Sequence, residues 1–470
     1  MRPLEILIPI ILAVYLLWPL TGRKRPQTVK LLPTFTLTVI VIHAIIEGLR
    51  WQMYPLYTFA IITLLTSIPT FSKTETGTGS AVRPVRIILS LGLLAIATAL
   101  PILLPVPVIP APSGPYQIGT RIYELTDESR KELYSGKDEP RRFQIQVWYP
   151  ADVSSTDERA QWMARADIYA PAISKDILEL PSFFLDHLAL ANVPAYKEAD
   201  IESTNDGFPI ILFSHGWNSF NAQNTGQALE LASHGYIVVG VQHTYGAVIT
   251  VFEDGTIAKN NPDALPSGAP DDEYDIAAQL LGDQWAGDLG YALDILTNEN
   301  NNASSPFYNS LDLSRVGVYG HSTGGGAAVQ FCGTDNRCKA LLGQDPFMRP
   351  VSYDILDKGI TQPAFFMFSQ VWHDDVNSRN NNLFKPFFAN STDTYGAVYI
   401  EGTAHYDFSD LPLLSPLAPQ LRLKGPINGK RVTAIVNDYL LSFFDMALKG
   451  QGTDLFENSG LYPEINPMNP

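Results

Sequence analysis

A pentapeptide at residues 320–324 has the residue types of an activated serine nucleophile. Its sequence, Gly320-His321-Ser322-Thr323-Gly324, fits the pattern G-x-S-x-G, in which the serine lies on a sharp turn between a strand and a helix. The two glycines remove side chains that would collide with the neighbours of such a turn. A serine held in this way attacks a carbonyl carbon once a neighbouring base removes its proton.

The serine needs a base, and in this type of site the chain order is serine, acid, histidine. His373 and His405 are the two histidines that follow Ser322. We expect His405 to be the base, because it lies in a loop directly after the apolar run Ala397–Ile400 and close to the C-terminal end. His373 is the weaker candidate.

Three aspartates are candidates for the acid that orients this base. Asp345 comes just after the apolar run 339–343, whereas Asp374 and Asp375 follow the next apolar run. An aspartate at the end of a strand can also simply cap a helix. Spacing alone therefore does not choose among the three.

Backbone N–H groups are expected to bind the oxyanion of the tetrahedral intermediate. One is the N–H of Thr323, directly after the serine. A second is expected from residues 214–217 (SHGW), which follow another apolar run. There Gly216 allows close approach of the backbone, and the N–H of Trp217 can face the site. We expect His215 to shape this loop by hydrogen bonding rather than to react.

The elements that must position these residues alternate between strand and helix patterns from about residue 116. Short apolar runs typical of strands buried on both faces are separated by segments with a helical apolar stripe. This alternation predicts a mainly parallel sheet covered on both faces and, with the serine motif, an α/β-hydrolase catalytic domain over residues 111–470. The expected strands are Arg142–Tyr149, Pro209–Ser214, Tyr236–Val241, Arg315–Tyr319, Ala340–Gly343, Ala364–Phe368 and Ala397–Ile400, and the expected helices are Gln223–His234, Glu273–Leu296, Gly326–Phe331 and Val432–Leu448.

Residues 1–110 form a region of a different kind, predicted to be helical and transmembrane with about four spans. A spanning helix needs about 20 apolar residues, and the second and third stretches are short enough to be one re-entrant hairpin or buried core helices instead. The count of three or four spans therefore stays open. The first stretch lacks a small-x-small cleavage pattern, so we expect an anchor rather than a signal peptide. The four stretches are Leu4–Leu20, Leu31–Ile46, Tyr54–Pro69 and Ile87–Val106.

Loop charges predict the orientation of this region, because positively charged loops stay cytoplasmic. The pattern places the N-terminus and everything after Val106 outside, so we expect an integral cell-membrane protein with an extracytoplasmic catalytic domain. His43 and Glu47 fit an interfacial position better than a proton relay. The basic residues that set the orientation are Arg23, Lys24, Arg25 and Lys30 after the first stretch, and Lys73, Arg83 and Arg86 before the fourth.

Charge and cysteine content exclude several classes of function. Residues 1–110 hold nine Lys or Arg and three Asp or Glu, whereas the whole chain has a net charge of −16. The remainder is therefore strongly acidic, which argues against nucleic-acid binding because such a surface repels phosphate backbones. Cys332 and Cys338 are too few for a zinc ribbon or a disulfide framework. One local disulfide and two inert thiols remain as alternatives.

The motifs together resemble the platelet-activating-factor acetylhydrolase family, including its bacterial membrane-anchored relatives, over roughly residues 112–450. Residues 213–220 (FSHGWNSF) and 231–241 (LASHGYIVVGV) are similar to the family's oxyanion loop and following strand. Residues 320–325 (GHSTGG) resemble its nucleophile turn, 342–350 (LGQDPFMRP) its acid loop, and 402–411 (GTAHYDFSDL) its histidine loop.

This resemblance implies that the acid is Asp345 and that the oxyanion donors are Trp217 and Thr323. It also implies a calcium- and cofactor-independent esterase, with no metal, that hydrolyses short or oxidised acyl chains of phospholipids. Gln344 and Pro346 depart from the residues expected beside the acid, which puts the substrate preference in doubt more than the triad.

Two other functions are compatible with the sequence. A general carboxylesterase for small esters or polyesters needs the same triad. A protein of another class, a membrane transporter or sensor with an inert hydrolase-like outer domain, is disfavoured by the intact serine, aspartate and histidine. The partners expected from the sequence are an ester or phospholipid substrate and a bilayer, and the oligomeric state stays open.

Overall fold

The computed structural model describes residues 1–72, 82–420, 422–456 and 461–468, and these form two compact units. Unit 1 contains Met1–Pro107, Leu185–Ala191 and Leu414–Leu417, and unit 2 contains the rest. Lys73, one of the basic residues that set the expected orientation, lies outside the described residues. The assignment of domains to 1–110 and 111–470 stays a prediction.

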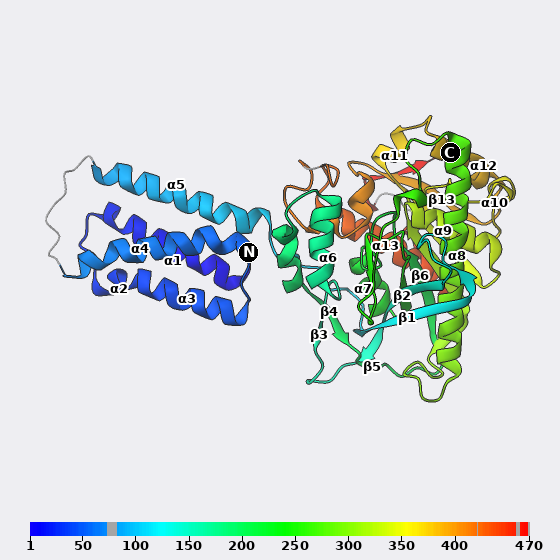
Figure 1. Ribbon diagram of the computed structural model, residues 1–470, viewed down its shortest axis with the longest axis horizontal. Helices are drawn as coiled ribbons and strands as arrows, with labels where there is room; N and C mark the ends of the chain where they lie inside the picture. Colours follow the sequence, from blue (N-terminus) through cyan, green and yellow to red (C-terminus); the bar gives the residue numbers. More distant parts are fainter. Residues whose placement is uncertain (73–81, 421, 457–460, 469–470) are drawn as a thin grey trace. The chain divides into compact units, whose positions relative to one another are not determined.

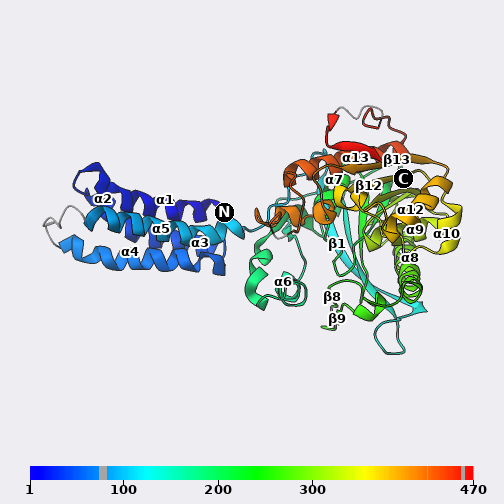
Figure 2. The same ribbon diagram turned by 90° about the horizontal axis from the view of Figure 1, so that it is seen from above.

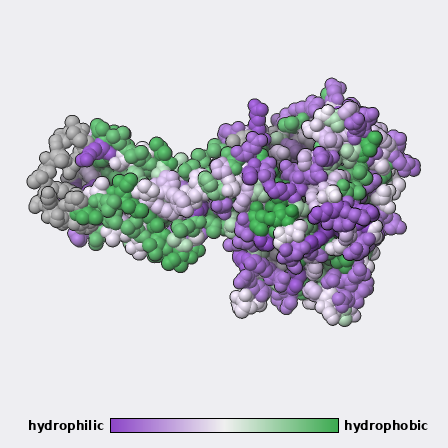
Figure 3. All heavy atoms as spheres, viewed as in Figure 1, coloured by the Kyte–Doolittle hydropathy of each residue, from purple (hydrophilic) through white to green (hydrophobic). Residues whose placement is uncertain are grey.

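Unit 1 is a bundle of apolar helices that also exposes apolar side chains. Ile45 is 78% exposed and Ile96 is 70% exposed, and the surface of this unit is largely hydrophobic (Figure 3). Two segments, Pro3–Thr21 and Pro84–Leu103, are long and apolar enough to cross a membrane, judged by length and composition only. The helices are α1 (Pro3–Leu17), α2 (Gln27–Lys30), α3 (Leu32–Ile46), α4 (Tyr54–Ser72) and α5 (Val82–Leu103).

Charged side chains inside unit 1 are paired with one another. The fully buried carboxylate of Glu5 accepts hydrogen bonds from Arg50 Nε at 2.6 Å and from Arg2 Nη2 at 2.8 Å. Arg50 also donates to the carbonyl oxygen of Pro101 at 3.1 Å. His43 is buried next to this network, 3.6 Å from the Glu5 carboxylate. These pairs hold α1, α3 and the end of α5 together without leaving a buried charge unpaired.

Unit 2 is built around a twelve-stranded mixed sheet (Figure 1). The order is β14-β13-β12-β11-β10-β6-β7-β2-β1-β4-β3, with β5 paired to β2. The six central strands from β13 to β7 are parallel to one another. The strands are β1 (Gln117–Lys131), β2 (Pro140–Asp152), β3 (Arg159–Gln161), β4 (Asn192–Lys197), β5 (Asp200–Ile201), β6 (Phe208–Ser214), β7 (Ile237–Gln242), β10 (Leu311–His321), β11 (Cys338–Gln344), β12 (Ala364–Ser369), β13 (Thr394–Ile400) and β14 (Ile465–Met468), and β8 (Ile249–Val251) with β9 (Ile257–Lys259) forms a separate hairpin.

Helices cover both faces of this sheet (Figure 2). On β12, Phe365 packs against Tyr439 of α13, whereas the next side chain, Phe366, packs against Phe384 of α12. Successive side chains of a strand point to opposite faces, so α13 and α12 lie on opposite sides. The helices are α6 (Ala166–Ala172), α7 (Thr225–Ser233), α8 (Asp271–Asn301), α9 (Thr323–Thr334), α10 (Tyr353–Lys358), α11 (Gln370–Asp374), α12 (Arg379–Asn390) and α13 (Gly429–Lys449).

The expected central strands and helices are present with shifted ends. Among the described residues, seven further strands were not expected: β1, β3, β4, β5, β8, β9 and β14. β1 pairs antiparallel with β2 along most of its length, although its sequence of mostly polar residues gave no strand signal. Only five of its fifteen side chains are buried, so few apolar residues mark it. β14 pairs antiparallel with β13 at the sheet edge.

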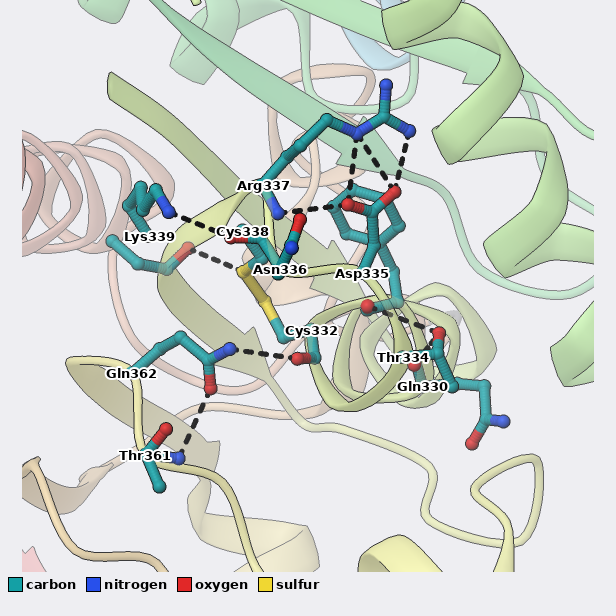
Figure 4. The surroundings of a disulfide bond; sticks show 12 residues. Gln330, Cys332, Thr334, Asp335, Asn336, Arg337, Cys338, Lys339, Thr361 and Gln362 are labelled. Carbon is teal, nitrogen blue, oxygen red and sulfur yellow. Dashed lines mark hydrogen bonds and ion pairs between the residues drawn. A yellow bond between two sulfur atoms is a disulfide. The ribbon is translucent and has the colours of Figure 1, made fainter. Parts of the chain in front are cut away.

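Cys332 and Cys338 are joined by a disulfide (Figure 4). Their Cα atoms are 5.1 Å apart, at the end of α9 and the start of β11. The bond closes the turn in which Arg337 binds the carboxylate of Asp335. Of the two alternatives that the sequence left open, the structure contains the local disulfide.

Candidate active site

Ser322 lies on the turn between β10 and α9. Its backbone has φ 56° and ψ −123°, a strained conformation for a residue with a side chain. The flanking glycines make this turn possible. A Cβ on Gly320 would lie 2.2 Å from the carbonyl oxygen of Gly324, and a Cβ on Gly324 would lie 2.1 Å from that of Ser214. The half-buried serine is therefore presented at the carboxyl end of the central strand.

Asp345 follows the neighbouring strand β11 and is fully buried. Its carboxylate accepts hydrogen bonds from the backbone N–H and the hydroxyl of Ser369, both at 2.7 Å. It also lies 2.9 Å from Nδ1 of His405. Ser369 ends β12 and was not singled out from the sequence. The structure thus brings Asp345 and His405 together and adds two donors that hold the carboxylate.

His405 begins a short 3-10 helix, His405–Phe408, after β13. Its ring stacks on Trp372 of α11, with ring centroids 4.5 Å apart and planes 2° from parallel. Nδ1 faces Asp345, so Nε2 is the nitrogen left to act as a base. Among the described residues, Ser322 Oγ has no hydrogen-bond partner, so its hydrogen bond with His405 is not formed in this structure. Catalytic hydrogen bonds of this kind often tighten only when substrate binds.

The other candidate residues have other partners or are exposed. His373 binds its neighbour Asp374 at 3.0 Å and stacks on Tyr399. Asp374 is 59% exposed, and Asp375 is exposed as well. Neither carboxylate forms an ion pair with His405 in the part of the chain that the structure describes.

The two expected oxyanion donors belong to segments next to Ser322. Thr323 is the first residue of α9, so its N–H has no partner within the helix. Gly216 is packed closely against the serine, since a Cβ there would lie 3.4 Å from Ser322 Cβ. Trp217 follows on the same loop. His215 is buried beneath it, where Nδ1 contacts the Gly216 carbonyl at 2.7 Å and Nε2 accepts from the His243 N–H at 3.1 Å.

A stack of aromatic rings supports this loop, and it was not predicted from the sequence. The indole of Trp217 stacks on Trp285, which stacks on His243 at 4.1 Å. His243 lies 2.9 Å from both Ser214 Oγ and the Asp288 carboxylate. Burial would raise the pKa of Asp288, but its charged and hydrogen-bonding partners, Arg141 first, hold it well below the usual range. This second serine, histidine and aspartate arrangement is closed to solvent and is structural.

Burial acts on both members of the Asp345–His405 pair. It raises the pKa of Asp345 to about 7 and lowers the pKa of His405 to about 4, because charge is disfavoured where water is removed. The pair therefore binds its first proton near pH 7, whichever of the two groups carries it. Above that pH the carboxylate is ionised and the imidazole is neutral, the state that a general base requires.

We expect kcat/KM for a soluble ester to fall as the pH is lowered through about 7, and to approach about a tenfold loss per pH unit below it. The reason is that the proton taken up by the pair removes the competent base. A pH–rate profile with a nonionisable ester measures this, with intrinsic fluorescence as the check that the protein stays folded. A rate that is constant down to pH 5 contradicts the assignment.

One group of potential metal ligands occurs among the described residues. Glu5, His43 and Glu47 of unit 1 have ligand atoms within 4.8 Å of one another. Arg2 and Arg50 already bind the Glu5 carboxylate, so the charge that would attract a cation is neutralised. In unit 2, a cavity of about 260 Å³ is lined by residues that are outside the candidate triad, among them Tyr169, Phe220 and Phe252 of its apolar wall.

The chain is similar in sequence to known proteins. A family model described as platelet-activating factor acetylhydrolase, isoform II, matches residues 105–458. The chain is 26% identical over 359 residues to the platelet-activating factor acetylhydrolase of Cavia porcellus, which covers 72% of this chain and 78% of that protein. It is 23% identical over 371 residues to that of Gallus gallus, covering 72% and 83%.

A solved structure shows the same fold. The ferulic acid esterase from Streptomyces cinnamoneus superposes with a TM-score of 0.62 at 22% identity, covering 77% of this chain and 100% of that chain. The predicted α/β-hydrolase fold is therefore confirmed. The family match begins at residue 105, after the end of α5, so the apolar helices of unit 1 lie outside it.

Proposed function

Because the chain belongs to the platelet-activating factor acetylhydrolase family and is a carboxylic ester hydrolase, we propose that Ser322, His405 and Asp345 form its catalytic triad. The observation that carries this proposal is the 2.9 Å contact between His405 Nδ1 and the buried Asp345 carboxylate. It lies at the same edge of the sheet as the strained Ser322. Asp374 contacts His373 instead, and both Asp374 and Asp375 are exposed, which supports Asp345 as the acid.

The mechanism follows from these positions. His405 Nε2 removes the hydroxyl proton as Ser322 Oγ bonds to the ester carbonyl carbon, and the N–H groups of Thr323 and Trp217 bind the oxyanion. Each donor contributes about 3 kcal/mol to the transition state in comparable enzymes. The imidazolium returns its proton to the leaving alkoxide, and the C–O bond of the ester breaks. Water, deprotonated by the same imidazole, then hydrolyses the acyl-enzyme and regenerates Ser322.

The proposed substrates are short or oxidised acyl esters of phospholipids. The names of the relatives support this class, and so does the apolar surface beside the site. Val371, Val376 and Tyr406 are all exposed large hydrophobic residues, and they are close in sequence to Trp372 and His405. A general carboxylesterase for small esters or polyesters is the second candidate, because the triad itself does not select the alcohol.

We expect the chain-length profile of hydrolysis to distinguish these two activities. A phospholipid acetylhydrolase should favour an acetyl over a palmitoyl chain at the second position of phosphatidylcholine in vesicles, and should favour the vesicle over a soluble p-nitrophenyl ester. The measurement is the initial rate on each substrate, with Ser322→Ala as the blank. Hydrolysis of soluble esters at equal rates, without any hydrolysis of the vesicle phospholipids, supports the general carboxylesterase instead. No labelling by a fluorophosphonate probe supports an inert domain.

We further propose that unit 1 anchors the protein in the cell membrane with unit 2 outside the cytoplasm. The clustered basic residues after α1 support this orientation, and the Cys332–Cys338 disulfide fits an oxidising compartment.

Labelling of thiols tests this orientation, because the chain has only two cysteines. We expect denatured protein from cells to bind no maleimide-polyethylene glycol until a reductant is added, and then to bind two. Cells are quenched with acid before lysis so that thiols do not oxidise afterwards. Two labels without reductant indicate a cytoplasmic unit 2 and overturn the orientation.

A further inference from the structure

Three loops around the candidate site are joined by a chain of buried side-chain hydrogen bonds. The backbone N–H of Gly216 donates to Gln223 Oε1 at 3.2 Å. Gln223 Nε2 lies 2.9 Å from His321 Nδ1, and His321 Nε2 lies 2.9 Å from the carbonyl oxygen of His405. Gln223 and His321 are both buried. The chain thus runs from the oxyanion loop, past the serine turn, to the backbone of the base.

The partners at its two ends fix the direction of every bond in this chain. A backbone N–H can only donate, so Gln223 must present its oxygen to Gly216 and its NH₂ group to His321. The imidazole then accepts at Nδ1 and donates from Nε2 to a carbonyl oxygen, which can only accept. Burial lowers the pKa of His321 to about 3, so the ring is neutral, as this pattern requires.

A second branch reaches the acid. Asn224 accepts from Gln223 and donates to the Phe408 carbonyl at 2.8 Å and to Gln344 Oε1 at 3.1 Å. Gln227 donates to the same Phe408 carbonyl at 2.7 Å and accepts from Gln344 Nε2 at 2.9 Å. Gln344 immediately precedes Asp345. Gln344, which departs from the family pattern, is therefore hydrogen-bonded to two side chains of this branch.

Buried polar side chains need paired donors and acceptors. Apolar residues would fill the same space without that need. The loops that carry Gly216, His405 and Asp345 begin where their strands end, so the sheet ladder no longer holds them. Catalytic groups must be held to within about 0.5 Å of their working positions. Side-chain hydrogen bonds between the loops supply that constraint here.

We propose that Gln223 and His321 are positioning residues that hold the oxyanion loop and His405 in register across Ser322. Both act through other groups: Gln223 through Gly216 and His321, and His321 through the His405 backbone and through its ring, whose centroid lies 4.4 Å from that of the His405 ring. The inference rests on the proposed triad, because it assigns the two residues to the positioning of that triad's base and oxyanion donors.

The test compares Gln223→Met with the matched control Gln330→Met. Gln330 is also buried and also uses both ends of its amide, donating to Asp283 at 2.7 Å and accepting from Ser352 N at 2.9 Å, but it contacts none of the three loops. For Gln223→Met we expect kcat on p-nitrophenyl acetate to fall by about 10- to 100-fold with KM unchanged. Affinity for a trifluoromethyl ketone analogue should fall by the same factor. Gln330→Met should change neither.

His321 provides an independent variant if Gln223→Met does not fold. His321→Phe should lose kcat as Gln223→Met does, whereas His321→Gln, which keeps a donor for the His405 carbonyl, should recover part of the loss. The double variant should lose no more than either single one, because one chain is broken at two points. Two outcomes indicate a general effect on packing and overturn the proposal. One is a loss of kcat in the double variant that equals the product of the two single losses. The other is a loss of kcat in Gln330→Met as large as that in Gln223→Met.

Ser322→Ala separates this outcome from failure of the proposed function. If Ser322→Ala is inactive while folded Gln223→Met and His321→Phe keep kcat within twofold of the wild type, only the positioning proposal fails. If Ser322→Ala keeps its activity, the proposed function fails and the positioning proposal fails with it.

Discussion

Ser322→Ala is expected to lower kcat for ester hydrolysis by about 10⁴-fold or more, the scale seen when the nucleophile of a serine hydrolase is removed. Ser322 is the one residue between the end of β10 and the start of α9, and its φ is 56°. The methyl group that replaces the hydroxyl has no lone pair with which to form the acyl-enzyme, so a burst of p-nitrophenol should also disappear.

The measurement is steady-state and burst-phase hydrolysis of p-nitrophenyl acetate by the full chain, together with labelling by a fluorophosphonate. Ser310→Ala is the matched control, because Ser310 directly precedes β10, at its opposite end, and its hydroxyl donates to the neighbouring Tyr308 carbonyl at 3.2 Å. Wild-type rates in Ser322→Ala with unchanged thermal unfolding would mean that the hydrolase reaction uses another nucleophile.

The second large effect is expected from Asp345→Asn, with a loss in kcat of about 10⁴-fold. The carboxylate accepts from Ser369 N, Ser369 Oγ and His405 Nδ1, so all of its contacts come from donors. An asparagine must turn its NH₂ group toward one of them. It then either loses the Ser369 contacts or forces the proton of His405 onto Nε2, which leaves no base for Ser322.

Asp374→Asn and Asp375→Asn are the comparison for this prediction and should keep kcat within about twofold, because both aspartates are exposed at the surface. Hydrolysis of the same ester by the three variants decides among the acids that the sequence left open. A collapse of activity in Asp374→Asn or Asp375→Asn, with Asp345→Asn still active, reverses the assignment of the acid.

Local patterns in the sequence were sufficient for the parts of this protein that depend on neighbouring residues. The serine turn could be predicted because strand, G-x-S-x-G and helix are contiguous, and because the steric need for Gly320 and Gly324 acts within a few residues. The central strands could be predicted because strands buried on both faces are continuous apolar runs. β1 could not, since its water-facing residues hide the pattern.

Only the tertiary structure decided which residues meet across the strand ends. Asp345, Asp374 and Asp375 all follow strands, and spacing along a chain does not measure distance through space. The loop directions that bring Asp345 to His405, and Ser369 to Asp345, depend on packing between segments far apart in sequence. The same holds for Gln223 and His321, because no local sequence pattern shows that these two polar side chains are buried side by side. Contacts of this kind are set by the folded sheet and not by the periodicity of any single element.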